Sequence, residues 1–254
     1  MTVGGIAFDA MTAQQVITRV RADLVAGRGG HIVTPNVDIV RQVRQSPKFA
    51  DQVSCGDLVV ADGAPLVWAS RLAGTRLPER VAGSDLIWDL SAAAADDERS
   101  IYVLGGTPGG ERPTSVVAAE RLADTFPGLD VAGACTPPMG FESNVAYLDE
   151  LAEELVEVAP DIVFVGLGFP KQERIITRLA EGLPSAWFLG CGAAVDFVAG
   201  RRRRAPVWMQ RSGLEWAHRL ASEPRRLFVR YVVHDAPVAA GLLLRSGWHG
   251  LRHR

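Results

Sequence analysis

Short apolar segments alternate with helical patterns along the chain up to about residue 200. Five segments are rich in aliphatic side chains and end at Gly, Thr, Asn or Asp: His31–Val33, Leu58–Val60, Ile101–Leu104, Ile162–Val165 and Ala186–Leu189. Between them, apolar residues recur at helical spacing, as in Leu148, Leu151 and Leu155. Continuous apolar strands separated by helices predict an α/β fold, with a Rossmann-like, mostly parallel sheet and helices on both faces.

The pattern changes after Gly200. The basic run Arg201–Arg204 comes first, Pro206 then stands at a predicted helix start, and Pro224 opens a last helix. A segment of about 50 residues is too small for a hydrophobic core of its own. We therefore expect an α/β domain over 1–200 and an amphipathic helical appendage over 201–254.

The composition is that of a globular chain. Of its 254 residues 48% are hydrophobic and 22% charged, which excludes disordered, collagen-like and coiled-coil proteins. The cysteines Cys55, Cys135 and Cys191 lie too far apart to predict a disulfide framework or a zinc site, so we expect reduced thiols in a cytosolic protein. The apolar stretches Val3–Phe8 and Ala236–Leu244 are too short for an export signal and for a membrane span, respectively.

Charge divides the chain into an acidic part and a basic part. The net charge is −2, but the residues from Arg201 onward carry +9 and those before it −11. Such a division is typical of a segment with an anionic partner: nucleic acid, phospholipid headgroups or a diphosphate. Trp208, Leu214 and Trp216 lie among the arginines and favour an element on an anionic bilayer. Solvated surface charge is the simpler alternative.

Candidate polar residues follow the predicted strands, at the edge where open α/β sheets bind ligands. Asp62 lies between Val60 and Gly63, where a carboxylate with a raised pKa is a candidate general base; the alternative is a helix cap. Thr34 and Asn36 flank a proline at the start of a predicted helix. Thr34 is a candidate cap, whereas the Asn36 amide offers a donor and an acceptor to a sugar.

Arginine and glycine residues supply candidate anion contacts. Arg80 precedes a helix that Ser84 or Asp85 could cap, and is a candidate clamp for a phosphate or sugar unless it pairs with Glu79. Glycines at strand ends let backbone N–H groups approach a phosphate, although neither common phosphate-loop spacing is present. The candidates for this role are Gly105, Gly106, Gly109 and Gly110, with turn formation alone as the alternative; Gly166, Gly168, Gly190 and Gly192 also follow predicted strands.

A further pair of polar residues follows Gly168. Gln172 and Glu173 direct an amide and a carboxylate to the same edge, or simply begin an exposed helix. The sequence has no DxD motif and no His/Cys cluster, so we expect no metal. It also lacks a dinucleotide loop with an acidic ribose contact, which disfavours a nucleotide-dependent oxidoreductase.

Taken together and in this order, these segments resemble glycosyltransferases of the WecG/TagA/CpsF family, glycosyltransferase family 26. The resemblance extends from about Val3 to Tyr231 and rests on TPNVDIV, LVVADGAPLVW, PERVAGSDL, YVLGG, IVFVGLGFPKQE, GCGAAVDFVAG and RAPVWMQRSGLEWAHRLASEPRRLFVRY. It implies an inverting, metal-independent and cofactor-free transfer of a hexosyl unit from a UDP-sugar to a sugar on a polyprenyl diphosphate. The hexosyl unit would be N-acetylmannosamine, its uronic acid or glucose, and the product a precursor of cell-surface polysaccharide.

The resemblance also assigns roles to residues. Asp62 would be the general base, and 1–200 the domain that binds the nucleotide sugar. The residues that would contact or orient substrate are Thr34, Asn36, Arg80, Asp85, Gly105, Gly166, Gly168, Gln172, Glu173, Gly190 and Gly192. Arg211, Arg219 and Arg226 of the appendage would meet the lipid diphosphate.

The expected partners are therefore a UDP-sugar donor, a polyprenyl-diphosphate sugar acceptor and an anionic membrane surface, with no nucleic acid. Self-association as a homo-oligomer stays open. We expect a cytoplasmic protein, peripheral on the inner face of the cell membrane. The alternative function is a non-enzymatic membrane or nucleic-acid-binding adaptor that uses the basic tail, but this leaves Asp62, Asn36 and Gln172 unexplained.

Overall fold

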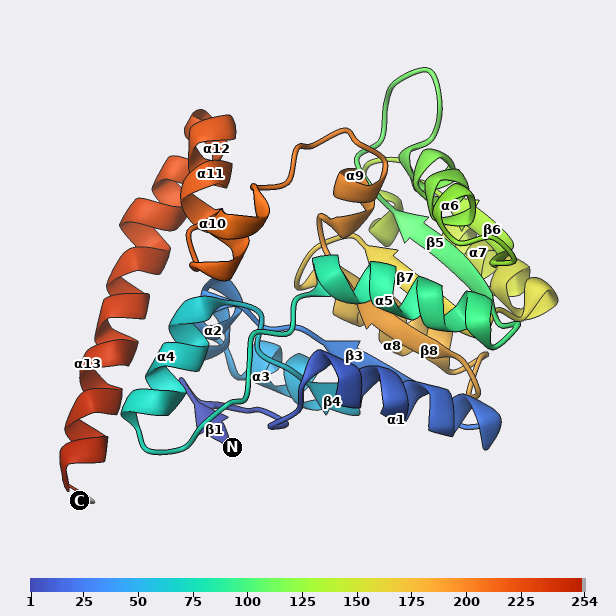
Figure 1. Ribbon diagram of the computed structural model, residues 1–254. Helices are drawn as coiled ribbons and strands as arrows, with labels where there is room; N and C mark the ends of the chain where they lie inside the picture. The colour runs from blue at the N-terminus through green and yellow to red at the C-terminus, as the bar shows by residue number, and fades with distance from the viewer. Residues whose placement is uncertain (253–254) are drawn as a thin grey trace.

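The structure is a computed structural model that describes residues 1–252, apart from the side chains of 211 and 249–252 (Figure 1). Within that range, six strands form one parallel sheet in the order β4-β3-β8-β7-β5-β6, and β1 pairs with β2 in a separate hairpin. The strands are β1 (Thr2–Val3), β2 (Ile6–Ala7), β3 (Gly30–Val33), β4 (Leu58–Val59), β5 (Ser100–Gly105), β6 (Asp130–Cys135), β7 (Ile162–Gly166) and β8 (Trp187–Gly190). The predicted parallel α/β sheet is confirmed.

Helices cover both faces of this sheet. One face carries α1 (Ala13–Val25), α5 (Gly83–Asp96), α6 (Thr114–Thr125) and α9 (Ala194–Val198). The other carries α2 (Val37–Gln45), α3 (Pro47–Ser54), α7 (Val145–Val158) and α8 (Lys171–Ala180), with the short 3-10 helix η1 (Phe141–Ser143) before α7. Successive strand residues point to opposite faces, so Ile32 packs in the first layer and Val33 in the second. Burial on both faces explains the continuous apolar runs.

Two parts of the β structure were not predicted. The edge strand β6 is made mainly of small or polar residues and is only partly buried, so it lacks the apolar run that marks the other strands. The N-terminal hairpin has two-residue strands and turns at Gly4 and Gly5, whose φ angles are 65° and 95°. The five predicted segments match β3, β4, β5, β7 and β8 to within one residue at each end.

Residues 201–252, here called the C-terminal segment, leave the sheet and form helices along one side of the molecule (Figure 1). They are α10 (Val207–Arg211), α11 (Glu215–Ser222), α12 (Pro224–Phe228), the π-helical turn η2 (Val229–Asp235) and α13 (Ala236–Arg252). α13 packs beside α4 (Ala64–Leu72), and Leu242 is buried in the apolar cluster that α4 forms with the hairpin. The segment is thus attached to the side of the body beyond β4.

Among the described residues, one helix is long and apolar enough to cross a membrane by length and composition. It runs over Pro224–Trp248, with a mean hydropathy of 1.4 in its 18-residue window, and is longer than the apolar run noted in the sequence. These two criteria do not distinguish a spanning helix from one that lies on a surface. In this structure Asp235 and Leu242 are buried against the body, whereas Val233 and Leu244 are exposed.

Candidate active site

The polar residues predicted from the sequence lie where parallel strands end, on one edge of the sheet. Thr34 follows β3, Asp62 follows β4, and Gly190 ends β8. These three strands are neighbours, because β3 lies between β4 and β8. The backbone N–H of Asp62 donates to the carbonyl oxygen of Pro35 at 2.9 Å, which joins the first two loops. Strand order therefore brings together residues that are distant in sequence.

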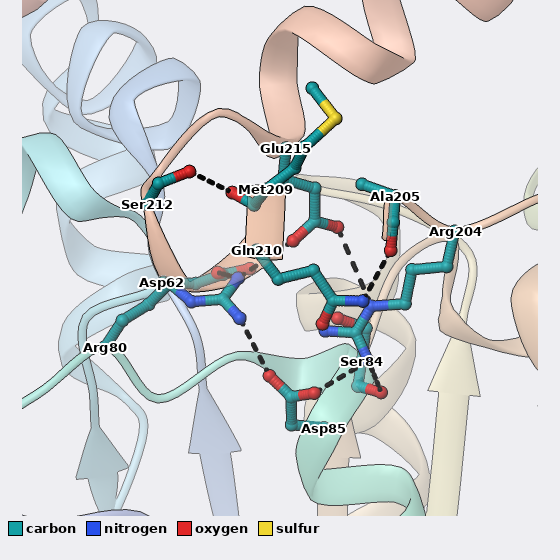
Figure 2. Close-up of polar contacts among 10 residues, drawn as sticks. All are labelled: Asp62, Arg80, Ser84, Asp85, Arg204, Ala205, Met209, Gln210, Ser212 and Glu215. Atoms are coloured by element: carbon teal, nitrogen blue, oxygen red, sulfur yellow. Dashed lines mark hydrogen bonds and ion pairs between the residues drawn. The ribbon is translucent and has the colours of Figure 1, made fainter. Parts of the chain in front are cut away.

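Asp62 is held with its carboxylate beside Arg80 (Figure 2). The N-cap of α4 is Gly63, with a φ of 144°, so the capping alternative for Asp62 is wrong. The Asp62 side chain is 28% exposed, and one carboxylate oxygen lies 3.8 Å from Nη1 of Arg80. Desolvation raises the pKa of Asp62 to about 6; Arg80 opposes this rise, and Glu215 and Asp85 add to it.

Arg80 is the centre of a group of ion pairs. Its Nη2 donates to Asp85 at 2.9 Å, and its Nη1 donates to Glu215 at 3.0 Å. Glu79, the partner weighed in the sequence analysis, instead accepts from the backbone of Ala13. The N-cap of α5 is Ala82 without a side-chain cap bond, so Asp85 is free for this pairing.

Two members of this group come from the C-terminal segment and were missed by sequence reasoning. Arg204 donates Nη1 to the carbonyl oxygen of Ser84 at 3.1 Å and lies 2.7 Å from Asp85, and its Nε lies 3.8 Å from Glu215 (Figure 2). In the sequence, Arg204 belongs to a basic run and Glu215 was counted only toward net charge. Their contacts cross more than a hundred positions, and no local spacing reveals them.

A second polar cluster, formed by Gln172, Glu173 and His31, is buried behind the loops that follow β7 and β8. The Gln172 side-chain oxygen accepts from the backbone N–H groups of Gly168, at 3.0 Å, and Gly192, at 3.1 Å. Its amide nitrogen donates to Glu173, whose other oxygen lies 2.8 Å from Nε2 of His31. Gln172 and Glu173 are 3% and 0% exposed. The exposed-helix alternative is therefore wrong: Gln172 joins the two loops, and Glu173 links Gln172 to His31 of β3.

Thr34 and Asn36 have separate tasks after β3. The Thr34 hydroxyl donates to the carbonyl oxygen of Gly190 at 3.2 Å and thereby links the ends of β3 and β8. Asn36 is the N-cap of α2, and its side-chain oxygen accepts from the backbone N–H of Ile39 at 3.1 Å. Thr34 is thus not the cap, and capping engages the oxygen of the Asn36 amide.

The strand-end glycines divide into packed and open positions. A Cβ on Gly105 would lie 2.5 Å from the Gly166 carbonyl oxygen, one on Gly166 2.5 Å from Val195, and one on Gly190 2.7 Å from the Gln172 amide nitrogen. Gly168 and Gly192, with φ angles of 79° and 54°, meet nothing within 4 Å. The first three are explained by close packing, whereas the latter two present backbone at the open edge.

Of the three arginines expected at a lipid diphosphate, the two whose side chains are described have partners other than Asp62. Arg226 donates to Glu223 within the C-terminal segment, and the Arg219 guanidinium lies 5.5 Å from the centre of the Phe197 ring. The side chain of Arg211 lies outside the described residues. Of these, Arg219 is near enough for its charge to lower the pKa of Asp62.

The part of the chain that the structure describes holds no group of three or more His, Cys, Asp or Glu residues placed to bind a metal ion. Asp196, also missed in the sequence, lies at the same edge: it accepts from the backbone N–H of Thr107 at 2.9 Å and lies 3.6 Å from Arg202. It joins the loop after β5 to the beginning of the C-terminal segment.

Comparison with known proteins gives one consistent result. The family model described as the glycosyl transferase WecG/TagA/CpsF family matches residues 1–253. A relative from Bacillus spizizenii, named N-acetylglucosaminyldiphosphoundecaprenol N-acetyl-beta-D-mannosaminyltransferase, is 32% identical over 78% of this chain and 74% of its own length. Relatives of the same name from Bacillus subtilis and Staphylococcus aureus (strain MW2) are 29% and 26% identical, over 78% and 88% of this chain and 73% and 85% of their own lengths. The chain belongs to the WecG/TagA/CpsF family of glycosyl transferases.

Proposed function

We propose that this protein transfers N-acetylmannosamine from a UDP-linked donor to the N-acetylglucosamine of a diphosphoundecaprenol-linked acceptor. The observation that carries the proposal is Asp62, a partly exposed carboxylate at the open edge of the sheet whose pKa is raised to about 6. Such a group is a base suited to neutral pH. The names of the relatives supply the sugar and the acceptor, in place of the uronic acid or glucose that the family resemblance also allows.

In this proposal the reaction is a single inverting displacement. Asp62 takes the proton from a hydroxyl group of the acceptor sugar as that oxygen attacks the anomeric carbon of the donor. The new carbon–oxygen bond forms on the face opposite the departing group, the bond to the diphosphate breaks, and UDP leaves with the bonding electron pair. Desolvation supports this role because it keeps Asp62 a stronger base than an exposed aspartate.

The leaving diphosphate needs positive charge, which we assign to arginines and backbone N–H groups rather than to a metal ion. Among the described side chains, Arg80 is the guanidinium paired with Asp62, and the loops that carry Gly168 and Gly192 lie at the open edge. The N–H groups of these two glycines donate to the Gln172 oxygen, so Gln172 would shape the loops while neighbouring N–H groups of the same loops meet the diphosphate. In the same proposal, Thr34, Asn36 and Asp85 contact the sugars. Gly105, Gly166 and Gly190 allow the loops to pack closely, and Glu173 supports Gln172 beneath them.

A lipid-linked acceptor requires the site to work at a membrane surface. The C-terminal segment exposes Trp208, Trp216 and Phe228 among its arginines, a composition suited to the headgroup region of an anionic bilayer. We assign Arg211, Arg219 and Arg226 to the acceptor diphosphate, residues 1–200 to catalysis, and 201–254 to lipid contact on the cytoplasmic side.

The decisive experiment is transfer by the purified protein from UDP-N-acetylmannosamine to a synthetic N-acetylglucosaminyl diphospholipid. UDP-N-acetylmannosaminuronic acid, UDP-glucose and UDP-N-acetylglucosamine are tested in parallel. Mass spectrometry should show one added N-acetylhexosamine, and NMR of the product should show the inverted anomeric configuration. Binding to liposomes without transfer from any donor would instead support the adaptor alternative.

The metal-free part of the proposal has its own measurement. Transfer in EDTA should equal transfer in its absence, because arginines and N–H groups supply the positive field. Loss of turnover in EDTA, restored by Mg²⁺ or Mn²⁺, would contradict it.

A further inference from the structure

Four charged side chains next to Asp62 form a closed ring of ion pairs. Going round it, Arg80 pairs with Asp85 at 2.9 Å, Asp85 with Arg204 at 2.7 Å, Arg204 with Glu215 at 3.8 Å, and Glu215 with Arg80 at 3.0 Å (Figure 2). We call this the ion-pair ring. Half of it belongs to the body and half to the C-terminal segment, so the surroundings of Asp62 are complete only when that segment is docked.

The backbone brings Glu215 to this position through a tight turn. Gly213, between α10 and α11, has a φ of 76°, and a Cβ there would lie 2.6 Å from that of Ala64 and 3.1 Å from the Trp68 ring. The turn therefore lies directly on α4, the helix that follows Asp62. Glu215 is the first residue of α11, two positions after this contact, which fixes where its carboxylate begins.

The ring has a direct consequence for Asp62 because two carboxylates share one nitrogen. Nη1 of Arg80 lies 3.0 Å from Glu215 and 3.8 Å from Asp62. Nη2 of the same guanidinium is engaged by Asp85. Nη1 thus lies within hydrogen-bonding distance of Glu215 but not of Asp62.

We propose that Glu215 is a positioning residue for the transfer reaction: it holds Nη1 of Arg80, so that this guanidinium stays at 3.8 Å from the Asp62 carboxylate without a hydrogen bond to it, and Asp62 remains an effective base. The inference rests on the proposed function and adds to it a residue that acts on Asp62 through Arg80. It also gives the C-terminal segment a part in tuning the base.

The charged groups that face Asp62 come from three parts of the chain. Arg80 precedes α5 and Asp85 lies in its first turn, Arg204 precedes α10, and Glu215 and Arg219 lie on α11. Neutralising Glu215 removes one negative charge near Asp62 and frees Nη1 of Arg80 to approach it. Both changes stabilise the ionised carboxylate, so both lower its pKa.

The experiment compares the pH dependence of kcat/KM for the parent and for Glu215→Gln. The acidic limb of the variant should move to lower pH by about one unit. Its alkaline plateau should fall roughly 3- to 10-fold, since a weaker base takes the proton less readily. Glu215→Asp, which keeps the charge, should keep its midpoint near that of the parent.

Glu223→Gln is the matched control, because it neutralises another glutamate of the C-terminal segment. Glu223 pairs with Arg202 at 3.0 Å and with Arg226, away from the ion-pair ring. The acidic limb of kcat/KM for Glu223→Gln should have the same midpoint as that of the parent. An equal shift in both variants would overturn the inference, since the effect would then come from loosening the segment rather than from Arg80.

A second readout does not need activity. Side-chain carboxyl ¹³C NMR, with Asp62→Asn to assign the signal, should show the Asp62 titration at lower pH in Glu215→Gln than in the parent. An unchanged or higher midpoint would overturn the inference. A parent protein that makes no product would contradict the proposed function alone, because this titration still decides what Glu215 does to Asp62.

Discussion

Different interactions stabilise the body and the C-terminal segment. In the body, strand β7 is buried along its whole length, and apolar helices close over both faces of the sheet. In the described part of the C-terminal segment the buried residues are Ala205, Leu227, Asp235 and Leu242. Ion pairs add further contacts with the body, as between Arg204 and Asp85 and between Arg230 and Asp38. The body supplies Asp62, the base of our proposal, together with Arg80 and Asp85, and the C-terminal segment supplies Arg204 and Glu215.

This difference changes the meaning of the uneven charge seen in the sequence. The acidic part and the basic part attract each other within one molecule: Arg202 lies near Asp196, Arg204 pairs with Asp85, and Arg230 pairs with Asp38 at 2.9 Å. The sequence analysis assigned the positive charge to an external anion. Part of it instead docks the segment on the body.

The largest expected effect comes from truncation after Gly200. Transfer to a lipid acceptor should be lost, because Arg204 and Glu215 leave the site together with the exposed aromatic residues. The body should stay folded, since two of its three apolar clusters contain no residue of the segment and the third includes Leu242 alone among its buried members. Circular dichroism and thermal melting measure the fold. An unfolded body would make the segment structural, and a fully active one would remove it from catalysis.

Asp62→Asn is expected to have the next largest effect. The amide is nearly the same size but takes no proton, so kcat should fall by about 10²–10⁴. Binding of the nucleotide sugar, measured by calorimetry, should be largely retained because the shape of the site is unchanged. Turnover within a few-fold of the parent would refute Asp62 as the base.

The effect of pH on the activity of the parent protein should be smaller than the effect of Asp62→Asn, but it can be measured directly. A base works ionised, and the pKa of Asp62 is raised to about 6. Activity should therefore be full above that pH, and kcat/KM should fall about tenfold per unit below it. A limb near the ordinary aspartate range would show that the desolvated environment does not form in solution.

The body was predictable from the sequence because its signals are local. Strands buried on both faces must be apolar throughout, and Asp62 and Arg80 were singled out as candidates from their places near predicted strand ends and turns. The edge strand β6 was missed because partial burial imposes no such pattern.

The ion-pair ring was missed for a different reason. Glu215 and Arg80 are 135 positions apart in the sequence. Glu215 is one of three acidic residues among twelve arginines after Gly200, and nothing in that composition indicates which arginine it pairs with. Asn36 shows a third case, in which the residue was found but its side-chain oxygen caps a helix.

The smallest expected effect tests the electrostatic attachment itself. Asp38 is buried on α2, pairs with Arg41, and lies 2.9 Å from Arg230 of the C-terminal segment. Asp38→Asn should weaken docking by about 1–3 kcal/mol, because two guanidiniums lose a buried charged partner. Hydrogen exchange should quicken in η2 and α13 but not in β7.

The matched control for this variant is Asp149→Asn, at an exposed pair with Arg178 in the body. Exposed pairs contribute about 0–1 kcal/mol, so exchange in η2 and α13 should stay at the parent rate. Salt provides an independent comparison, since about 0.5 M NaCl shortens the screening length to less than half of that at 0.05 M. It should speed exchange in α11 to α13 in the parent protein while the sheet keeps its protection. If salt changes the exchange rate of α11 to α13 no more than that of the sheet, then Leu242 and its apolar neighbours, rather than the ion pairs, hold the segment in place.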